Sequence, residues 1–240
     1  MKKVAVVVMS IMLLSLALFG CGKKSALEGK VVDSKGSPMA GVKVVAKQEQ
    51  PIKGYEQFES TTGADGVFKF TKLFPGSAYE LNTYLDGTNK NLTIKTESGP
   101  EGQTKLLPES ITIRFQFSKD GATALDTNTG LMWARNANIA GRGMPWGEAM
   151  GWVSTLDIGG HKDWRLPNKM ELTQFVKSGE REKLYGQLAS IGFTNVQADW
   201  YWSGTENIAN GAWMVSMKDS SLVSGYRYDN NYVWPVRSGQ

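Results

Sequence analysis

The sequence predicts two folded domains behind an N-terminal export signal, an all-β sandwich followed by an α+β domain. Three observations support this prediction. The chain opens with an apolar run that ends at its single cysteine. Short alternating segments fill its first half, and all eight tryptophans lie after residue 130. Such a change of composition within 240 residues favours two separate cores.

Residues 1–20 have the layout of a secretory signal, with two lysines before an apolar run. Gly20 stands directly before Cys21, and this ending resembles the lipobox of bacterial lipoproteins. The resemblance implies that Cys21 carries the acyl chains and that residues 21–26 form a short tether. Gly22 stands where an aspartate favours retention at the inner membrane. We therefore expect a lipid-anchored protein of the cell envelope, at the outer membrane of a Gram-negative bacterium.

The alternative to this lipoprotein is an uncleaved membrane anchor. Residues 4–19 are short for that role, since a membrane-spanning helix needs about 20 apolar residues. The formal net charge of +4 includes Lys2 and Lys3 of the signal, so the remaining chain is close to neutral. A neutral chain excludes the basic surface typical of nucleic-acid binding. The expected partners are the membrane, through the lipid, and a glycan or another envelope protein.

Residues 27–112 form the predicted β-sandwich. Turn sequences rich in glycine, proline, serine and aspartate separate short runs of alternating apolar residues. Their regular spacing, without a helical period, is typical of a sandwich. We expect strands at residues 27–34, 41–48, 66–73, 78–85, 91–98 and 110–117.

Two segments of this domain, GKVVDSKGSPMAGVKV and TTGADGVFKFTKLFPGSAYEL, resemble the carboxypeptidase regulatory-like, or transthyretin-like, domain. The resemblance implies a transthyretin/Ig-like sandwich that serves as a spacer or docking module. Asp33 and Asp65 are candidate metal ligands. Both lie in glycine-containing turns, where aspartate commonly accepts backbone N–H bonds. We therefore expect them to be turn residues, and expect no metal.

Residues 113–240 form the predicted α+β domain. A strand, a turn and a second strand are expected within residues 123–136. A helix is expected at residues 145–156, since Pro145 is suited to its start and Gly159 and Gly160 lie beyond its end. Its buried face would carry Trp146, Met150, Val153 and Leu156. Aromatic strands are expected at residues 199–206, 211–218 and 225–237.

The stretch DWRLPNKMEL, residues 163–172, gathers charged and aromatic side chains around one proline. Asn168 and Glu171 have the spacing of a capping box, in which each side chain bonds to an N–H group at the start of a helix. Arg165 is suited to making two bonds to a carboxylate or to carbonyl groups. A ligand site and a structural role both fit these residues. We favour the structural role, in which Trp164, Arg165, Asn168 and Glu171 hold two helices against the sheet.

Six motifs follow one another in this domain: DxxTGLMW, WxEAM, GGHxDWRLPNxxEL, YWSGT, AWxV and YVWPVR. In this order they resemble the DUF1566 family, also called the Lcl C-terminal domain, of bacterial surface proteins. The resemblance covers residues 123–237. It implies a C-type-lectin-like fold and an adhesive or ligand-binding role.

An enzymatic role has little support in the sequence. His161 is the single histidine, which excludes a zinc site made of several histidines. A glycan-active enzyme could use two carboxylates, and Asp199, Glu206 and Asp229 are candidates in the late loops. Solvated loop carboxylates are the simpler interpretation. We expect a protein without catalytic residues or cofactors.

The binding hypothesis depends on the late loops, where aromatic rings alternate with amides and carboxylates. Rings pack on the C–H face of a sugar while amides bond to its hydroxyl groups. Trp202, Trp213 and Trp234 are expected to be core residues. The candidate ligand-binding residues are Glu206, Asn207, Asn210, Tyr226, Tyr228, Asp229 and Asn230, with no bound metal expected. The rival hypothesis is a structural subunit that docks another envelope protein and has no sugar site.

Overall fold

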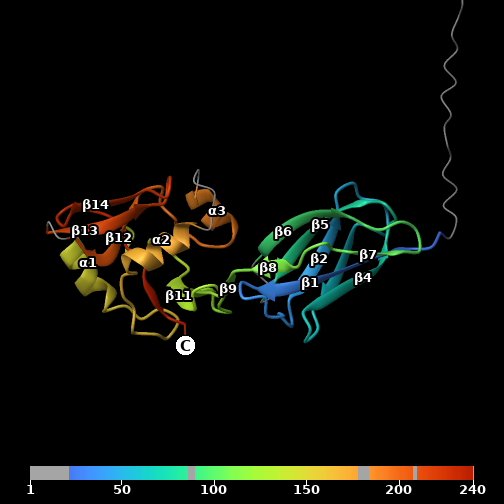
Figure 1. Cartoon of the computed structure of the whole chain (residues 1–240), viewed down its shortest axis with the longest axis horizontal. Coiled ribbons are helices and arrows are strands. Elements are labelled where there is room, and N and C mark those ends of the chain that lie inside the picture. Colours follow the sequence, from blue (N-terminus) through green and yellow to red (C-terminus); the bar gives the residue numbers. More distant parts are fainter. Residues whose placement is uncertain (1–21, 86–89, 178–183, 208–209, 240) are drawn as a thin grey trace, which may run out of the picture.

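The computed structural model describes residues 22–85, 90–177, 184–207 and 210–239. The predicted signal and Cys21 lie outside the described residues. Among the helices of the described segments, none is both long enough and apolar enough to cross a membrane. The described chain forms two parts side by side along its long axis, each with its own buried cluster (Figure 1). The clusters divide between Ile113 and Phe115.

Among the described residues, eight strands in two sheets form the first part. The order in one sheet is β4-β1-β7, with β8 also paired to β1, and the order in the other is β3-β2-β5-β6. One buried cluster draws side chains from both sheets, as in a sandwich. The strands are β1 (Ser25–Asp33), β2 (Lys43–Gln48), β3 (Gln57–Thr61), β4 (Val67–Leu73), β5 (Ala78–Tyr84), β6 (Lys90–Glu97), β7 (Thr104–Leu106) and β8 (Ile111–Ile113).

The predicted strands of this part are present, with two additions and one correction. The strand predicted at residues 110–117 is wrong, because the chain breaks at Arg114: Ile111–Ile113 pairs with β1 in this part, and Phe115–Phe117 belongs to a sheet of the second part. Strands β3 and β7 were not predicted, because neither has more than one large apolar residue in its alternation. Both aspartates act in turns, as predicted. The Oδ1 atom of Asp33 accepts the N–H groups of Lys35 and Ser37 at 2.8 Å, and these backbone bonds, that of Ser37 foremost, lower the pKa of Asp33. The Oδ1 atom of Asp65 accepts the N–H group of Val67 at 3.0 Å.

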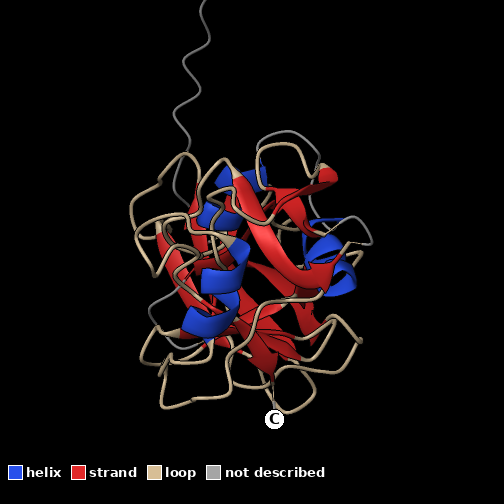
Figure 2. Cartoon of the chain, turned by 90° about the vertical axis from the view of Figure 1, so that its left-hand side faces the viewer, coloured by secondary structure: helices blue, strands red, loops and turns tan. Residues whose placement is uncertain are grey.

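Seven strands and three helices form the described second part, with the helices on the outside of the strands (Figure 2). One sheet has the order β15-β11-β10-β9 and the other the order β12-β13-β14. The strands are β9 (Phe115–Phe117), β10 (Thr123–Asp126), β11 (Leu131–Ala134), β12 (Trp200–Glu206), β13 (Gly211–Ser216), β14 (Leu222–Tyr226) and β15 (Val236–Ser238). The helices are α1 (Trp146–Val153), α2 (Lys169–Lys177) and α3 (Leu184–Ser190).

Several predictions for this part were wrong. The segment at 225–237 is not one strand, because a long loop separates the end of β14 from β15. Helix α1 ends at Val153, well before the two glycines. Its buried face carries Ala149, and Met150 is 41% exposed. Helix α3 was not predicted.

The core of the second part is built from aromatic rings. The rings of Trp133 and Phe175 lie 4.1 Å apart between centroids. Phe193 and Trp234 pack edge-on against Phe175 at 5.6 and 4.9 Å. Because β11, α2 and the segment before β15 each contribute a ring, this cluster joins the sheet to its covering helix.

A buried ion pair fixes the chain where the two parts meet. Arg114, between β8 and β9, donates two hydrogen bonds to Asp126, from Nε at 2.9 Å and from Nη2 at 2.6 Å. The Asp126 carboxylate is inaccessible to solvent and also accepts the N–H group of Asn128 at 3.0 Å. The guanidinium lies over the ring of Phe115, 4.7 Å from its centroid. Bidentate geometry and packing together compensate for the loss of hydration.

We therefore expect Asp126→Ala to lower the free energy of unfolding by about 3–5 kcal/mol, because it leaves the Arg114 charge without its carboxylate. The measurement is the midpoint of chemical denaturation. Glu59→Ala is the control, since Glu59 makes an exposed ion pair with Lys43 at 2.9 Å and its loss should change stability by less than about 1 kcal/mol. Equal destabilisation in the two variants would contradict the assignment.

Candidate functional site

The segment that follows His161 is held between the two sheets of the second part. Trp164 is buried, and its indole N–H donates to the carbonyl of His161 at 2.8 Å. The backbone of Arg165 exchanges two hydrogen bonds with Val236 of β15, at 3.0 and 2.9 Å. The N–H group of Gly204 on β12 donates to the carbonyl of Pro167 at 2.8 Å. The segment is therefore tied to a strand on either side.

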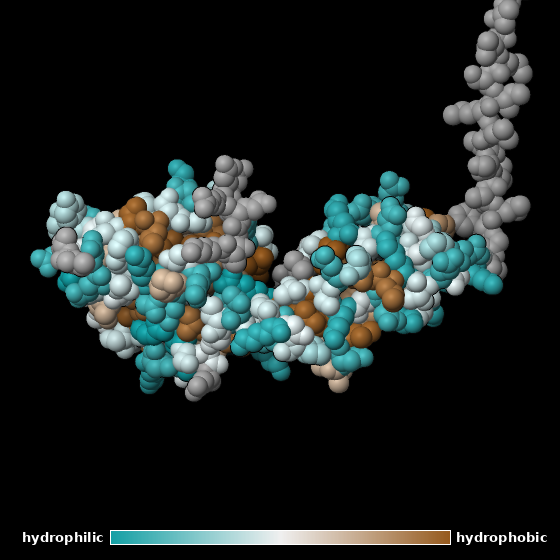
Figure 3. All heavy atoms as spheres, viewed as in Figure 1, coloured by the Kyte–Doolittle hydropathy of each residue, from teal (hydrophilic) through white to brown (hydrophobic). Residues whose placement is uncertain are grey.

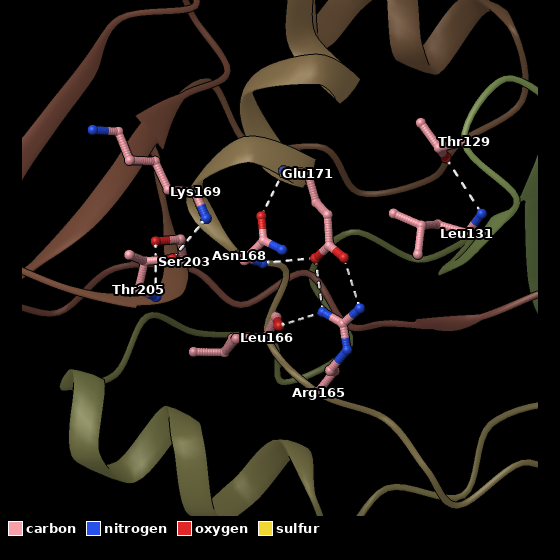
Figure 4. Close-up of polar contacts among 9 residues, drawn as sticks. All are labelled: Thr129, Leu131, Arg165, Leu166, Asn168, Lys169, Glu171, Ser203 and Thr205. Carbon is pink, nitrogen blue, oxygen red and sulfur yellow. Dashed lines mark hydrogen bonds and ion pairs between the residues drawn. The ribbon is translucent and has the colours of Figure 1, made fainter.

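The predicted capping box is present at the start of α2 (Figure 4). Asn168 Oδ1 accepts the N–H group of Glu171 at 2.8 Å, and Glu171 Oε2 accepts that of Asn168 at 2.8 Å. Thr205 of β12 adds a third bond, because its hydroxyl oxygen accepts the N–H group of Lys169 at 2.8 Å. Three of the backbone donors at the start of α2 are thus satisfied by side chains.

Arg165 makes the predicted bidentate bond, and its partner is Glu171. Nη1 donates to Oε2 at 2.7 Å and Nη2 to Oε1 at 2.8 Å. Burial raises the pKa of Glu171, but the bonds from Arg165 and Asn168 outweigh it and hold that pKa below its ordinary value. The side chain of Arg165 also donates to the carbonyl of Leu166 at 3.1 Å. These side-chain bonds stay within one helix and the segment that leads into it, so the prediction that Arg165 locks two helices against the sheet was too broad.

A second arginine, Arg237 of β15, secures the start of the same segment and was not predicted. Its Nε donates to Asp163 Oδ1 at 2.7 Å, and this bond lowers the pKa of Asp163. Arg237 is buried, whereas the Arg165 side chain is 47% exposed. In the closing VWPVR motif, strand alternation places Arg237 on the opposite face from Val236. The sequence does not show that other residues cover this face, so the burial of Arg237 could not be predicted.

For Arg165→Ala we expect a loss of about 1 kcal/mol in the free energy of unfolding, because water can replace the lost bonds at a half-exposed site. The Asn168 cap remains in this variant. Thermal denaturation measures the change, with Arg142→Ala as the control, since Arg142 makes an exposed ion pair with Glu148. Because the pKa of Glu171 is lower in the folded protein than in the unfolded chain, its carboxylate contributes fully to the free energy of unfolding at a pH above its unfolded pKa. This contribution is lost as the pH falls through the pKa that Glu171 has in the folded protein. A variant that melts like the parent yet loses ligand binding would instead place Arg165 in a binding site.

The candidate binding residues lie on two neighbouring loops, one after β12 and one after β14. Glu206 ends β12 and forms an ion pair with Arg227, whose Nη2 lies 2.9 Å from Oε2. Asn207 donates from Nδ2 to the hydroxyl oxygen of Ser224 on β14 at 2.6 Å. The guanidinium of Arg227 also lies over the Trp146 ring, 4.6 Å from its centroid. Side chains thus join the loop after β12 to the loop after β14 and to the start of α1.

The most prominent feature of this region is a pair of exposed tyrosines. Tyr226 is 67% and Tyr228 is 73% exposed. Their rings are parallel within 6° with centroids 5.2 Å apart. A tight turn holds them, because the N–H group of Asp229 donates to the carbonyl of Tyr226 at 3.0 Å and Asp229 Oδ2 accepts the N–H group of Tyr226 at 3.2 Å. We call Tyr226 and Tyr228 the tyrosine pair.

The remaining candidates have separate roles. Asn210 has a left-handed backbone at φ 57°, a conformation that asparagine tolerates better than most residues. Asn230 is exposed beside the tyrosine pair. Each of the three carboxylates considered for catalysis makes a contact within the protein. Glu206 pairs with Arg227, Asp229 accepts a backbone N–H group in its turn, and Asp199 Oδ1 accepts the N–H group of Trp200 at 2.8 Å. Within the described ranges no group of three or more acidic, histidine or cysteine side chains could hold a metal ion.

The prediction that Trp213 is a core residue was wrong. Trp202 and Trp234 are fully buried, but Trp213 is only partly buried on β13. The Lys169 ammonium lies over its ring, 3.2 Å from the centroid. Register places Trp213 opposite Ser224 and Gly211 opposite Tyr226, so Trp213 and Tyr226 are diagonal neighbours on one face of the sheet. The face therefore has more aromatic surface than the loops alone provide.

Sequence reasoning missed the residues that support this face. Arg227 was not among the candidate residues, and its pairing with Glu206 depends on the register of β13 with β14. The stacking of Arg227 on Trp146 joins residues that are distant in the chain. On the side shown in Figure 3, hydrophobic residues form separate groups among hydrophilic ones. Isolated groups of this kind are normal for a soluble surface and do not identify a site by themselves.

Comparison with protein families gives a match within the second part. Residues 122–237 match the Lcl C-terminal domain. The resemblance noted in the sequence is confirmed over this range. The match contains the tyrosine pair, the ion pair of Glu206 with Arg227, and the segment at 163–172. The comparison with curated proteins found no match.

Similarity to solved structures is partial. The chain shows 20% identity to BcpA, the major pilin subunit of Bacillus cereus, over 38% of this chain and 30% of that chain, with a TM-score of 0.29. It shows 17% identity to a DUF3823 family protein from Bacteroides ovatus, over 51% and 62%, with a TM-score of 0.30. It shows 13% identity to the Yersinia pseudotuberculosis adhesin InvE, over 82% and 60%, with a TM-score of 0.31. The chain spans less than two thirds of each of these proteins.

Proposed function

We propose that this protein is a lipid-anchored envelope lipoprotein whose Lcl C-terminal domain is a lectin-like binding head for a glycan. The observation that carries the proposal is the tyrosine pair. Two exposed rings in a fixed parallel stack present flat apolar surface to solvent, held by a turn that Asp229 secures. Exposed aromatic surface of this kind suits the C–H face of a sugar ring. Asn207, Asn230 and the Glu206–Arg227 pair lie on the same two loops and supply polar groups that would bond its hydroxyl groups.

Charge supports a ligand of low charge. Arg227 is already paired with Glu206, and the ammonium of Lys169 lies on the Trp213 ring. Binding that neutralises at most about two charges depends only weakly on ionic strength. A single sugar on a shallow face is held near the millimolar range, about −4 kcal/mol. Many anchored copies that contact one polymer would provide durable attachment.

The second candidate function is a docking subunit that binds another envelope protein. The apolar groove described below favours it, since grooves of that kind also bind partner side chains. The two candidate functions differ in their ligand, so a binding test with a soluble glycan distinguishes them. We place the glycan-binding head first because the tyrosine pair is fixed before any ligand binds.

Anchoring is tested by Cys21→Ser in the full chain. Because the cysteine is the expected point of lipid attachment, the variant should leave the membrane fraction or accumulate as an unprocessed precursor. Fractionation of cells followed by immunoblotting measures this. Ser25→Ala, at the start of β1 and within the predicted tether, is the matched control and should fractionate like the parent. If Cys21→Ser matures and fractionates normally, the lipid assignment is wrong.

The binding face is tested with a Tyr226→Ala, Tyr228→Ala double variant on a panel of neutral and acidic polysaccharides. We expect the double variant to lose binding to any polysaccharide that retards the parent protein. Its melting temperature should not change, because both rings are mostly exposed. Tyr185→Ala on α3 is the matched control, since it removes another exposed tyrosine. Affinity electrophoresis at two salt concentrations measures retention and its salt dependence. If the double variant is retained like the parent, the site lies elsewhere and the docking function takes first place.

A further inference from the structure

A groove of about 410 Å³ lies between α1 and the segment that leads into α2. This volume falls within the range of small-molecule sites. Its lining includes three buried apolar side chains, Val153, Trp164 and Leu166. Met150, which was expected to face the core, is exposed at the groove. The groove thus has an apolar floor that the fold leaves accessible.

The polar residues of the groove are uncharged or already neutralised. Ser154 and Asn168 contribute a hydroxyl group and an amide group to the lining. Arg165 is the one charged residue of the lining, and Glu171 holds its guanidinium through two bonds. A second anion would have to compete with that carboxylate. A charged ligand group would therefore lose its hydration without gaining a counter-charge, whereas a neutral group would not.

The groove also borders the proposed binding face. Gly204, which lines the groove, lies two residues before Glu206 on β12, a rise of about 7 Å along a strand. Met150 lies one helical turn after Trp146, on which Arg227 rests. The groove therefore lies beside the Glu206–Arg227 pair, which is the polar part of the proposed binding face.

We propose that this groove is a subsite for the acetamido group of an N-acetylated hexosamine in the glycan chain. The inference rests on the proposed function and specifies its ligand. The acetamido methyl group would cover the apolar floor, and its neutral amide would bond to Asn168 and Ser154 at the rim. A plain hydroxyl group at the same carbon would leave the floor uncovered. A carboxylate or sulfate group would meet no free cation.

Two trisaccharides test the subsite, tri-N-acetylchitotriose and cellotriose, which share one backbone and differ only in the substituent at C2. We expect the acetylated sugar to bind about tenfold more tightly, from burial of one methyl group together with one or two hydrogen bonds. Titration followed by NMR gives both affinities. The indole N–H signal of Trp164 should shift with the acetylated sugar only.

Gly204→Val is the variant that fills the groove. A Cβ at Gly204 would meet Leu166 Cβ at 3.4 Å and Met150 Sδ at 3.8 Å, which are ordinary contacts, and the backbone there needs no glycine. The variant should keep its melting temperature, bind cellotriose as the parent does and lose the tenfold preference. Gly186→Val on α3 is the matched control, since a Cβ there meets nothing within 4 Å.

Each other result overturns the subsite. Equal affinity for the two sugars, or a preference that survives Gly204→Val, contradicts the subsite. The proposed function still stands in that case if the tyrosine double variant loses glycan binding. If neither trisaccharide binds at millimolar concentration, the subsite is wrong, and the polysaccharide panel with the tyrosine variant decides the proposed function separately. If an apolar peptide shifts the Trp164 signal and the acetylated sugar does not, the groove is a docking site.

Discussion

Hydrogen bonds from tryptophan indoles to backbone carbonyls are the constraint on which the second part depends. This part has no cysteine, so no disulfide can fix its long connections. A buried indole N–H group without a partner is costly, and for four tryptophans of this part a backbone carbonyl accepts its hydrogen bond. Each of these bonds fixes either the start of a helix or an irregular segment. The bonds are Trp146 to Ser203 at 2.9 Å, Trp164 to His161 at 2.8 Å, Trp202 to Met144 at 2.9 Å and Trp234 to Ala134 at 2.7 Å.

One of these bonds connects the core to the candidate face. Trp146 begins α1 and accepts the guanidinium of Arg227 on its ring, while its N–H group bonds to β12. Arg227 then reaches Glu206 at the end of the same strand. The exposed face is therefore supported by a buried ring, which reduces the entropy lost when a ligand binds. The tyrosine pair lies on the loop that Arg227 anchors.

The sequence predicted elements where local chemistry decides them and failed where packing decides them. The capping box of Asn168 and Glu171 is local, and it was predicted correctly. Helix α1 has apolar residues on more than one side, so periodicity could not show that Met150 is exposed. The role of Trp213 depends on the neighbouring Lys169, which is distant in the chain. In the candidate face the loops were predicted from composition, but the pairing of Glu206 with Arg227 requires a strand register that no local pattern contains.

The segment DWRLPNKMEL does not divide cleanly into a structural part and a binding part. Glu171 neutralises Arg165 in order to complete the cap of α2, and the same bond removes the one cation from the lining of the groove. Trp164 bonds to the carbonyl of His161, and this fixes the ring that forms the apolar floor. The bonds that stabilise the helix start thus also determine which chemistry the groove accepts. Our proposal of a neutral, partly apolar ligand group rests on these same bonds, because they leave the lining of the groove without an unpaired charge.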